Sequence, residues 1–164
     1  MFNKERVNIS FMLLLLFEWR IFMHEAFERQ RIFIAVKGVL FHDGKTLIVR
    51  RSEIQTPDGL GWWEFPGGTL EFGEQPVQTL VREFKEETCL EITPEQLLYV
   101  WSAQNNPEEQ IIVITYLCQC GDISGLSLSE EHTEYMWVDK TSLRKYLAQD
   151  IKKALDANNS WERL

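Results

Sequence analysis

The alternation of apolar and polar residues predicts a β-sheet with one central helix and one C-terminal helix. Runs rich in Ile, Val, Leu and Phe, bounded by Gly, Pro, Asn and Asp, are typical of strands. The predicted strands span residues 31–41, 46–51, 97–104, 110–120 and 134–138. An Asp-Gly pair between the first two strands predicts a hairpin turn. Strands on both sides of a central helix favour a mixed sheet covered by helices on both faces.

The connections and the C-terminal end are predicted from local signals. Residues 52–61 contain Pro, Asp and Gly and are predicted to form a loop, and residues 94–96 a short connection. From Thr141 onward, one helix is predicted, with Asp139 as its N-cap. Its apolar residues fall at helical spacing: Leu143, Tyr146, Leu147, Ile151 and Leu155.

The central helix, predicted from Pro76 to Thr88, has an apolar face and an acidic face. The predicted buried stripe consists of Val77, Leu80, Val81, Phe84 and Thr88. Glu83, Glu86 and Glu87 are spaced i, i+3 and i+4, so they are expected to project close together. Their repulsion destabilises a bare helix, and the dipole at this end favours cations. Because Mg²⁺ and Mn²⁺ take oxygen ligands, the cluster indicates a site for hard cations.

A solvated acidic face is the simpler explanation for any single Glu-x-x-Glu-Glu pattern, and two neighbouring features argue against it here. Arg82 lies beside the cluster and Glu74 lies eight residues earlier. We expect this pair to form a partly buried bridge that pins the preceding loop to the helix. The Gly67–Gly68 turn allows the backbone to approach a ligand closely.

The whole segment resembles the Nudix box of the MutT-like Nudix hydrolases, G-x5-E-x7-R-E-U-x-E-E-x-G-U, where U is a bulky apolar residue. The fixed positions are matched by Gly68, Glu74, Arg82, Glu83, Phe84, Glu86, Glu87 and Leu90. Cys89 stands where the family has Gly. The residue after such a helix usually adopts the left-handed conformation, which Gly adopts at little cost. For Cys this conformation costs about 1 kcal/mol, unless the helix ends differently.

The resemblance implies an α/β/α sandwich, an α+β or α/β fold whose mixed sheet has the Nudix helix on one face and the C-terminal helix on the other. It covers residues 31–157 and leaves out residues 1–30 and the tail 158–164. It also implies an Mg²⁺- (or Mn²⁺-)dependent pyrophosphohydrolase. The substrate would be a nucleoside diphosphate linked to another moiety, either a nucleoside triphosphate or an ADP-ribose-like molecule.

The resemblance further assigns roles to single residues. The proposed cation ligands are Glu83, Glu86, Glu87 and the Gly67 carbonyl. Arg82 would orient the carboxylates, and Glu74 would have the structural role of holding Arg82. The general base would be a helix glutamate or, from the loop before the last strand, Glu131 ahead of Glu130; His132 is expected at the surface or behind the ligands. Candidate substrate-binding residues are Arg50, Arg51, Trp63 and Gly68.

Two other function classes compete with this enzyme. A non-catalytic Nudix-like nucleotide-binding module would keep the fold, but such modules typically lose box glutamates, and this chain has them all. An acidic interaction domain without a ligand would leave the glycine turn and the spacing of Glu74 and Arg82 unexplained.

Composition and charge limit the kinds of partner that the protein is expected to bind. The chain has 164 residues with a net charge of −8, which argues against binding to a nucleic-acid duplex but not against a small nucleotide. Three cysteines without a dense framework favour reduced thiols in the cytoplasm. The apolar run at residues 11–17 is too short to cross a membrane. Residues 1–30 are expected to dock as a helix on the domain or on a second subunit of a homodimer; alternatively, Met23 is the natural start and residues 1–22 are a translated upstream stretch.

Overall fold

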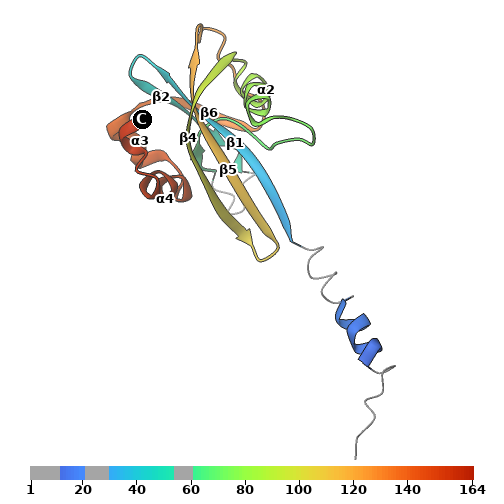
Figure 1. Ribbon diagram of the computed structural model, residues 1–164. Helices are drawn as coiled ribbons and strands as arrows, with labels where there is room; N and C mark the ends of the chain where they lie inside the picture. Colours follow the sequence, from blue (N-terminus) through green and yellow to red (C-terminus); the bar gives the residue numbers. More distant parts are fainter. Residues whose placement is uncertain (1–11, 21–29, 54–60) are drawn as a thin grey trace, which may run out of the picture.

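The computed structural model describes residues 12–20, 30–53 and 61–164. Residues 12–20 are helical. The elements of the remaining described chain are β1 (Arg31–His42), β2 (Lys45–Arg51), β3 (Trp63–Glu64), α2 (Pro76–Thr88), β4 (Ile92–Asn106), β5 (Glu109–Cys120), β6 (His132–Asp139), α3 (Lys140–Tyr146), α4 (Gln149–Ala157) and the 3₁₀ helix η2 (Trp161–Arg163). The sheet lies between α2 on one side and α3 with α4 on the other (Figure 1).

The sheet is mixed, as the sequence predicts. Its strand order is β3-β2-β1-β5-β4, and β6 pairs with β2. β1 runs parallel to β5, from Arg31 opposite Glu109 to Leu40 opposite Cys118. The β1–β2, β2–β3, β2–β6 and β4–β5 pairs are antiparallel. The predicted fold class, a mixed sheet with α2 on one face and the C-terminal helices on the other, is therefore confirmed.

Each face of the sheet has its own apolar core, because neighbouring strand residues point to opposite faces. On the α2 face, Leu80 and Phe84 belong to a buried cluster with Val36, Leu40 and Leu47. The opposite face packs α3 and α4 through a cluster that includes Val39, Ile48, Phe65, Leu143, Leu147 and Leu155. The two clusters fix the sheet between its covering helices.

The predicted buried stripe of α2 is wrong at two positions. Val77 and Val81 are 43% and 37% exposed. The helix instead buries Thr79, Leu80, Phe84, Glu87 and Thr88, so its packed side is rotated towards Glu87. Burial of Thr79 costs little because its hydroxyl donates to Glu74 Oε2 at 2.8 Å.

The single C-terminal helix is also a wrong prediction, although its N-cap is right. Asp139 accepts a hydrogen bond from the Ser142 N–H at 2.9 Å. The chain then breaks into α3 and α4 because Leu147 and Ala148 have extended ψ angles of 144° and 149°. In this break the Ala148 N–H donates to the Trp63 carbonyl at 2.9 Å. Pairing with β3 therefore replaces one turn of helix.

The start of β4 also differs from the prediction. β4 begins at Ile92, and the predicted connection at 94–96 is a strand irregularity between Pro94 and Gln96. The C-terminal tail packs on β4, where Arg163 donates to the Leu97 carbonyl at 3.0 Å. Most of the predicted loop 52–61, Met23 and the remainder of the N-terminal segment lie outside the described residues. Among the described helices, none is long and apolar enough to cross a membrane.

Helix α2 ends with a residue that glycine usually provides. Cys89 has φ 60° and ψ 3°, and its N–H donates to the Lys85 carbonyl at 3.0 Å. The helix therefore keeps the left-handed cap that the family pattern implies, with a side chain at a position where Cβ causes strain.

We expect Cys89→Gly to raise stability, because glycine removes this strain of about 1 kcal/mol and loses part of the gain to its greater freedom when unfolded. The melting temperature should rise by about 1–3 °C. Cys89→Ala, which retains Cβ, is the matched control and should show no comparable gain. An unchanged or lower melting temperature for Cys89→Gly would contradict the capping argument.

Candidate active site

The glycine turn lies directly against β1. The Val36 N–H donates to the Gly68 carbonyl at 2.8 Å, and the Gly38 N–H donates to the Pro66 carbonyl at 2.9 Å. Gly67 has φ +127°, and a Cβ there would lie 2.2 Å from the Val36 carbonyl oxygen. Only glycine fits this approach, which brings the backbone of the turn beneath α2.

Two carboxylates from α2 border this turn. Glu87 is 2% exposed, and its Oε2 accepts a hydrogen bond from the Gly67 N–H at 2.7 Å. A Cβ built on Gly68 would lie 2.2 Å from the carboxylate carbon of Glu83. The absence of a side chain at Gly68 therefore makes room for Glu83, and both glutamates reach the same short stretch of backbone.

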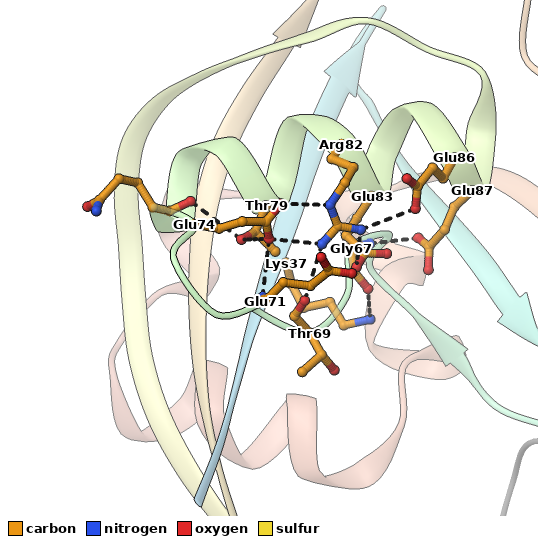
Figure 2. A network of polar contacts seen from close by, with 11 residues as sticks. Lys37, Gly67, Thr69, Glu71, Glu74, Thr79, Arg82, Glu83, Glu86 and Glu87 are labelled. Carbon is orange, nitrogen blue, oxygen red and sulfur yellow. Dashed lines mark hydrogen bonds and ion pairs between the residues drawn. The ribbon is translucent and has the colours of Figure 1, made fainter.

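Arg82 connects the loop to the remaining glutamates, and Figure 2 shows its guanidinium among them. Its Nε and Nη2 donate to the two oxygens of Glu74 at 2.8 and 3.0 Å. Its Nη1 donates to Glu83 at 2.9 Å and to Glu86 at 3.2 Å. The predicted bridge between Glu74 and Arg82 is present, and hydrogen bonds from Arg82 and Thr79 lower the pKa of Glu74 to about 2.

A set of ionisable groups that includes Glu87 lies beside the glycine turn, and we call it the inner charge cluster: Lys37, Arg51, Glu64, Glu87 and His132, of which Lys37 and Glu64 were not predicted as site residues. Glu64 is buried, and its Oε1 lies 3.0 Å from Arg51 Nε, 3.4 Å from Lys37 Nζ and 3.6 Å from His132 Nε2. Burial disfavours the charged form of Glu64, but Lys37, His132 and Arg51 outweigh it and hold its pKa below the usual range.

Two members of this cluster, Lys37 and Glu64, could have been suspected from the sequence. Lys37 is the only charged residue between Ile32 and Phe41, in a run otherwise typical of a buried strand. Glu64 lies between two aromatic residues just before the glycine turn. A charged residue in such an apolar run is costly to bury unless it is paired, so each predicts a partner.

Glu87 and His132 are the other buried members of the cluster. Burial raises the pKa of Glu87, while Lys37, His132 and the Gly67 N–H act in the opposite direction. His132 is buried, with Nε2 3.9 Å from Glu87 Oε1. Neither of its ring nitrogens has a hydrogen-bond partner among the described residues. Of the two places expected for His132, the surface is therefore excluded, and the side chain lies between the carboxylates of Glu64 and Glu87.

The candidate substrate-binding residues on β2 and β3 have different surroundings. Arg51 points to Glu64 in the inner charge cluster, whereas its neighbour Arg50 pairs with Glu134 at 2.7 Å. Trp63 is half-buried, and its ring packs edge-on against Tyr146 with centroids 6.2 Å apart. Glu131 is exposed in the turn just before β6, so the structure does not bury it with Glu87.

The oxygen atoms of this site are of the type that binds a hard cation, but they do not form a preformed set of ligands around one position. In the described ranges, no three His, Cys, Asp or Glu side chains are close enough together to hold a metal ion. Glu83 and Glu86 are held by Arg82, and the Gly67 carbonyl accepts a hydrogen bond from Lys37. Carboxylate and carbonyl oxygens are the donors that Mg²⁺ takes, and here they face protein cations instead.

Comparison with known proteins decides the family. A family model described as NUDIX domain matches residues 32–157, which is most of the chain. The chain belongs to the NUDIX domain family.

Individual NUDIX relatives agree with this assignment. An ADP-ribose pyrophosphatase of Methanocaldococcus jannaschii is 30% identical over 148 residues, which cover 88% of this chain and 79% of that protein. A CTP pyrophosphohydrolase of Escherichia coli is 32% identical over 111 residues, covering 68% of this chain and 78% of that protein. The crystal structure of a MutT protein from Methanosarcina mazei superposes with a TM-score of 0.68 at 25% identity, covering 79% and 94% of the two chains.

The bridge between Glu74 and Arg82 in this NUDIX domain makes a pH-dependent prediction. Because the folded protein holds the pKa of Glu74 near 2 instead of 4.5, its charge stabilises the fold above about pH 4.5, and the effect is lost as the pH falls towards 2. Glu74→Gln should lower the melting temperature by a few degrees at neutral pH, and the difference should shrink in acid.

Thermal unfolding at several pH values measures this difference in melting temperature. Glu71→Gln is the matched control, since Glu71 lies in the same loop without an ion pair to Arg82 in the described structure. An equal stability difference at neutral pH and at pH 3 would show that Glu74 does not act through its charge.

Proposed function

We propose that this NUDIX protein is a pyrophosphohydrolase that uses Mg²⁺ or Mn²⁺ to cleave the diphosphate linkage of a nucleoside diphosphate joined to another moiety. The observation that carries the proposal is Glu87, a buried glutamate hydrogen-bonded to the turn at Gly67. A fold does not gain stability from such a carboxylate, because its desolvation is costly. Its retention, with every other box glutamate, supports a role in chemistry.

The residues that would hold the cations are Glu83, Glu86, Glu87 and the Gly67 carbonyl. A bound cation neutralises phosphate charge and lowers the pKa of attacking water. Arg82 has a complementary role, because it holds Glu83 and Glu86 at 2.9 and 3.2 Å and is itself fixed by Glu74. The general base is proposed to be a helix glutamate or Glu131, whose exposure leaves it accessible to water.

The substrate side of the site is proposed to use Arg51, Arg50, Trp63 and the backbone at Gly68. Both arginines are paired with carboxylates, Arg51 with Glu64 and Arg50 with Glu134 and Glu53. Arg51 is the stronger candidate for phosphate because its charge also interacts with Glu87 of the proposed metal site. Trp63, half-buried beside Tyr146, offers part of a ring for stacking on a base.

The two relatives named above are an ADP-ribose pyrophosphatase and a CTP pyrophosphohydrolase. Their names correspond to the two proposed types of substrate, an ADP-ribose-like molecule and a nucleoside triphosphate. Formation of the nucleoside monophosphate should therefore be assayed with nucleoside triphosphates, ADP-ribose, dinucleoside polyphosphates and nucleotide sugars, each with Mg²⁺ and with Mn²⁺. Tight binding of one compound without turnover would instead establish a non-catalytic nucleotide-binding module.

The proposed setting is the cytoplasm, with a small-molecule nucleotide as partner and neither a nucleic-acid duplex nor a membrane. Among the described residues, Cys89, Cys118 and Cys120 are free thiols, in keeping with this location. The helix at residues 12–20 exposes apolar side chains, including Leu13, Leu16 and Trp19, which agrees with the expected homodimer. Light scattering of the full chain measures the assembly.

Glu87→Gln tests the enzyme directly. The substitution keeps the shape and an acceptor for the Gly67 N–H but removes the charge, so turnover should fall by about 100-fold or more while the chain still folds. Circular dichroism and melting curves check the fold. Glu91→Gln, an exposed glutamate just beyond α2, is the matched control and should retain activity. A small effect of Glu87→Gln would show that the metal assignment is wrong.

Paired substitutions on β2 test the phosphate contact. Arg51→Gln should raise KM by about tenfold, because a charge-assisted hydrogen bond to phosphate is lost. Arg50→Gln should have a smaller effect on KM, since Arg50 faces Glu134. Equal effects, or a larger effect at Arg50, would reverse the assignment of the two arginines.

A further inference from the structure

Lys37 is the one member of the inner charge cluster whose side chain donates to the carbonyl of the metal-binding turn. β1 carries its side chain to the glycine turn, where Nζ donates to the Gly67 carbonyl (Figure 2). The same Nζ lies 3.4 Å from Glu64 Oε1, and the side chain is 14% exposed. The ammonium therefore lies against the carbonyl oxygen that the proposed function gives to a divalent cation.

The surroundings explain why a cation is needed at this point. Glu64 and Glu87 are both buried, and two nearby carboxylates repel each other unless positive charge lies between or beside them. Lys37 favours the charged form of each glutamate. In the protein without metal, this lysine supplies charge that a bound cation would otherwise supply.

The same position of Lys37 also disfavours binding of a divalent cation at the Gly67 carbonyl. A carbonyl oxygen that accepts from an ammonium is a poorer ligand, and a positive charge beside the site repels a divalent ion. Lysine suits an exchangeable contact, because its ammonium is a point charge on a flexible stem. Arg82 cannot be displaced by a metal ion as readily, since it forms two hydrogen bonds to Glu74 and further hydrogen bonds to Glu83 and Glu86.

We propose that Lys37 is a built-in counter-cation: it occupies the Gly67 end of the metal site in the metal-free protein and leaves the carbonyl when a divalent cation binds. Glu64, 3.4 Å away, is the partner to which the displaced ammonium moves. Lys37 then stabilises the metal-free fold and weakens metal binding at the same time. This inference rests on the metal site of the proposed function.

Removal of the charge should separate these two effects. For Lys37→Met, direct titration with Mn²⁺ in the absence of substrate, followed by calorimetry or by the EPR signal of free Mn²⁺, should give a Kd lower than that of the parent protein by about fivefold or more. The metal-free melting temperature should fall, and saturating Mn²⁺ should narrow the gap between variant and parent. If Lys37 has only a structural role, its replacement should weaken metal binding instead.

Two more variants keep the test sharp. Lys37→Gln also removes the charge but retains an N–H for the carbonyl, so it should bind Mn²⁺ more tightly too. Lys45→Met, on the adjacent strand β2, changes the net charge equally at an exposed residue and should leave the Kd unchanged. Failure of both Lys37 variants to fold even with saturating Mn²⁺ would overturn the inference, because the lysine would then be required whether or not metal is bound.

The outcomes distinguish this inference from the proposed function. If the parent protein binds no Mn²⁺, or if Glu87→Gln binds it equally well, the metal site itself is wrong. If the parent binds Mn²⁺ in a manner that depends on Glu87, but Lys37→Met binds it equally or more weakly, only the role of Lys37 is overturned.

Discussion

Burial of negative charge between the sheet and α2 is the constraint on which the rest of this site depends. Glu87 and Glu64 are nearly inaccessible to water, yet both belong to a small region where the backbone of the glycine turn also lies. An uncompensated buried carboxylate would cost several kcal/mol. The chain meets this cost with Lys37 and Arg51 for Glu64, and with the Gly67 N–H for Glu87.

This constraint also determines how α2 packs. A helix free to follow hydrophobicity alone would bury Val77 and Val81, yet both are exposed and Glu87 is inside. The rotation is possible because the turn approaches β1 closely enough to present the Gly67 N–H to that carboxylate. Leu80 and Phe84 still anchor the helix on the sheet, so apolar packing holds the helix while polar contacts set its rotation.

Local signals in the sequence were sufficient for much of the fold. The bounds of α2, the hairpin after β1 and the Asp139 cap depend on residues within a few positions of one another, and all three were predicted. The break at Leu147–Ala148 was missed, because it depends on pairing with Trp63, more than eighty residues earlier. The burial of His132 and the contact between Lys37 and Gly67 were missed for the same reason.

Arg82 and Lys37 differ in how many contacts hold them, and this difference follows from side-chain chemistry. Arg82 has a planar fork of donors that Glu74, Glu83 and Glu86 all engage, so its release would break several hydrogen bonds together. Lys37 makes one hydrogen bond and one ion pair, and release from the carbonyl leaves the ion pair intact. In the proposed metal site, Arg82 would keep the carboxylates ordered whether or not metal is bound, whereas Lys37 could leave the Gly67 carbonyl for the metal, because it would lose only one contact.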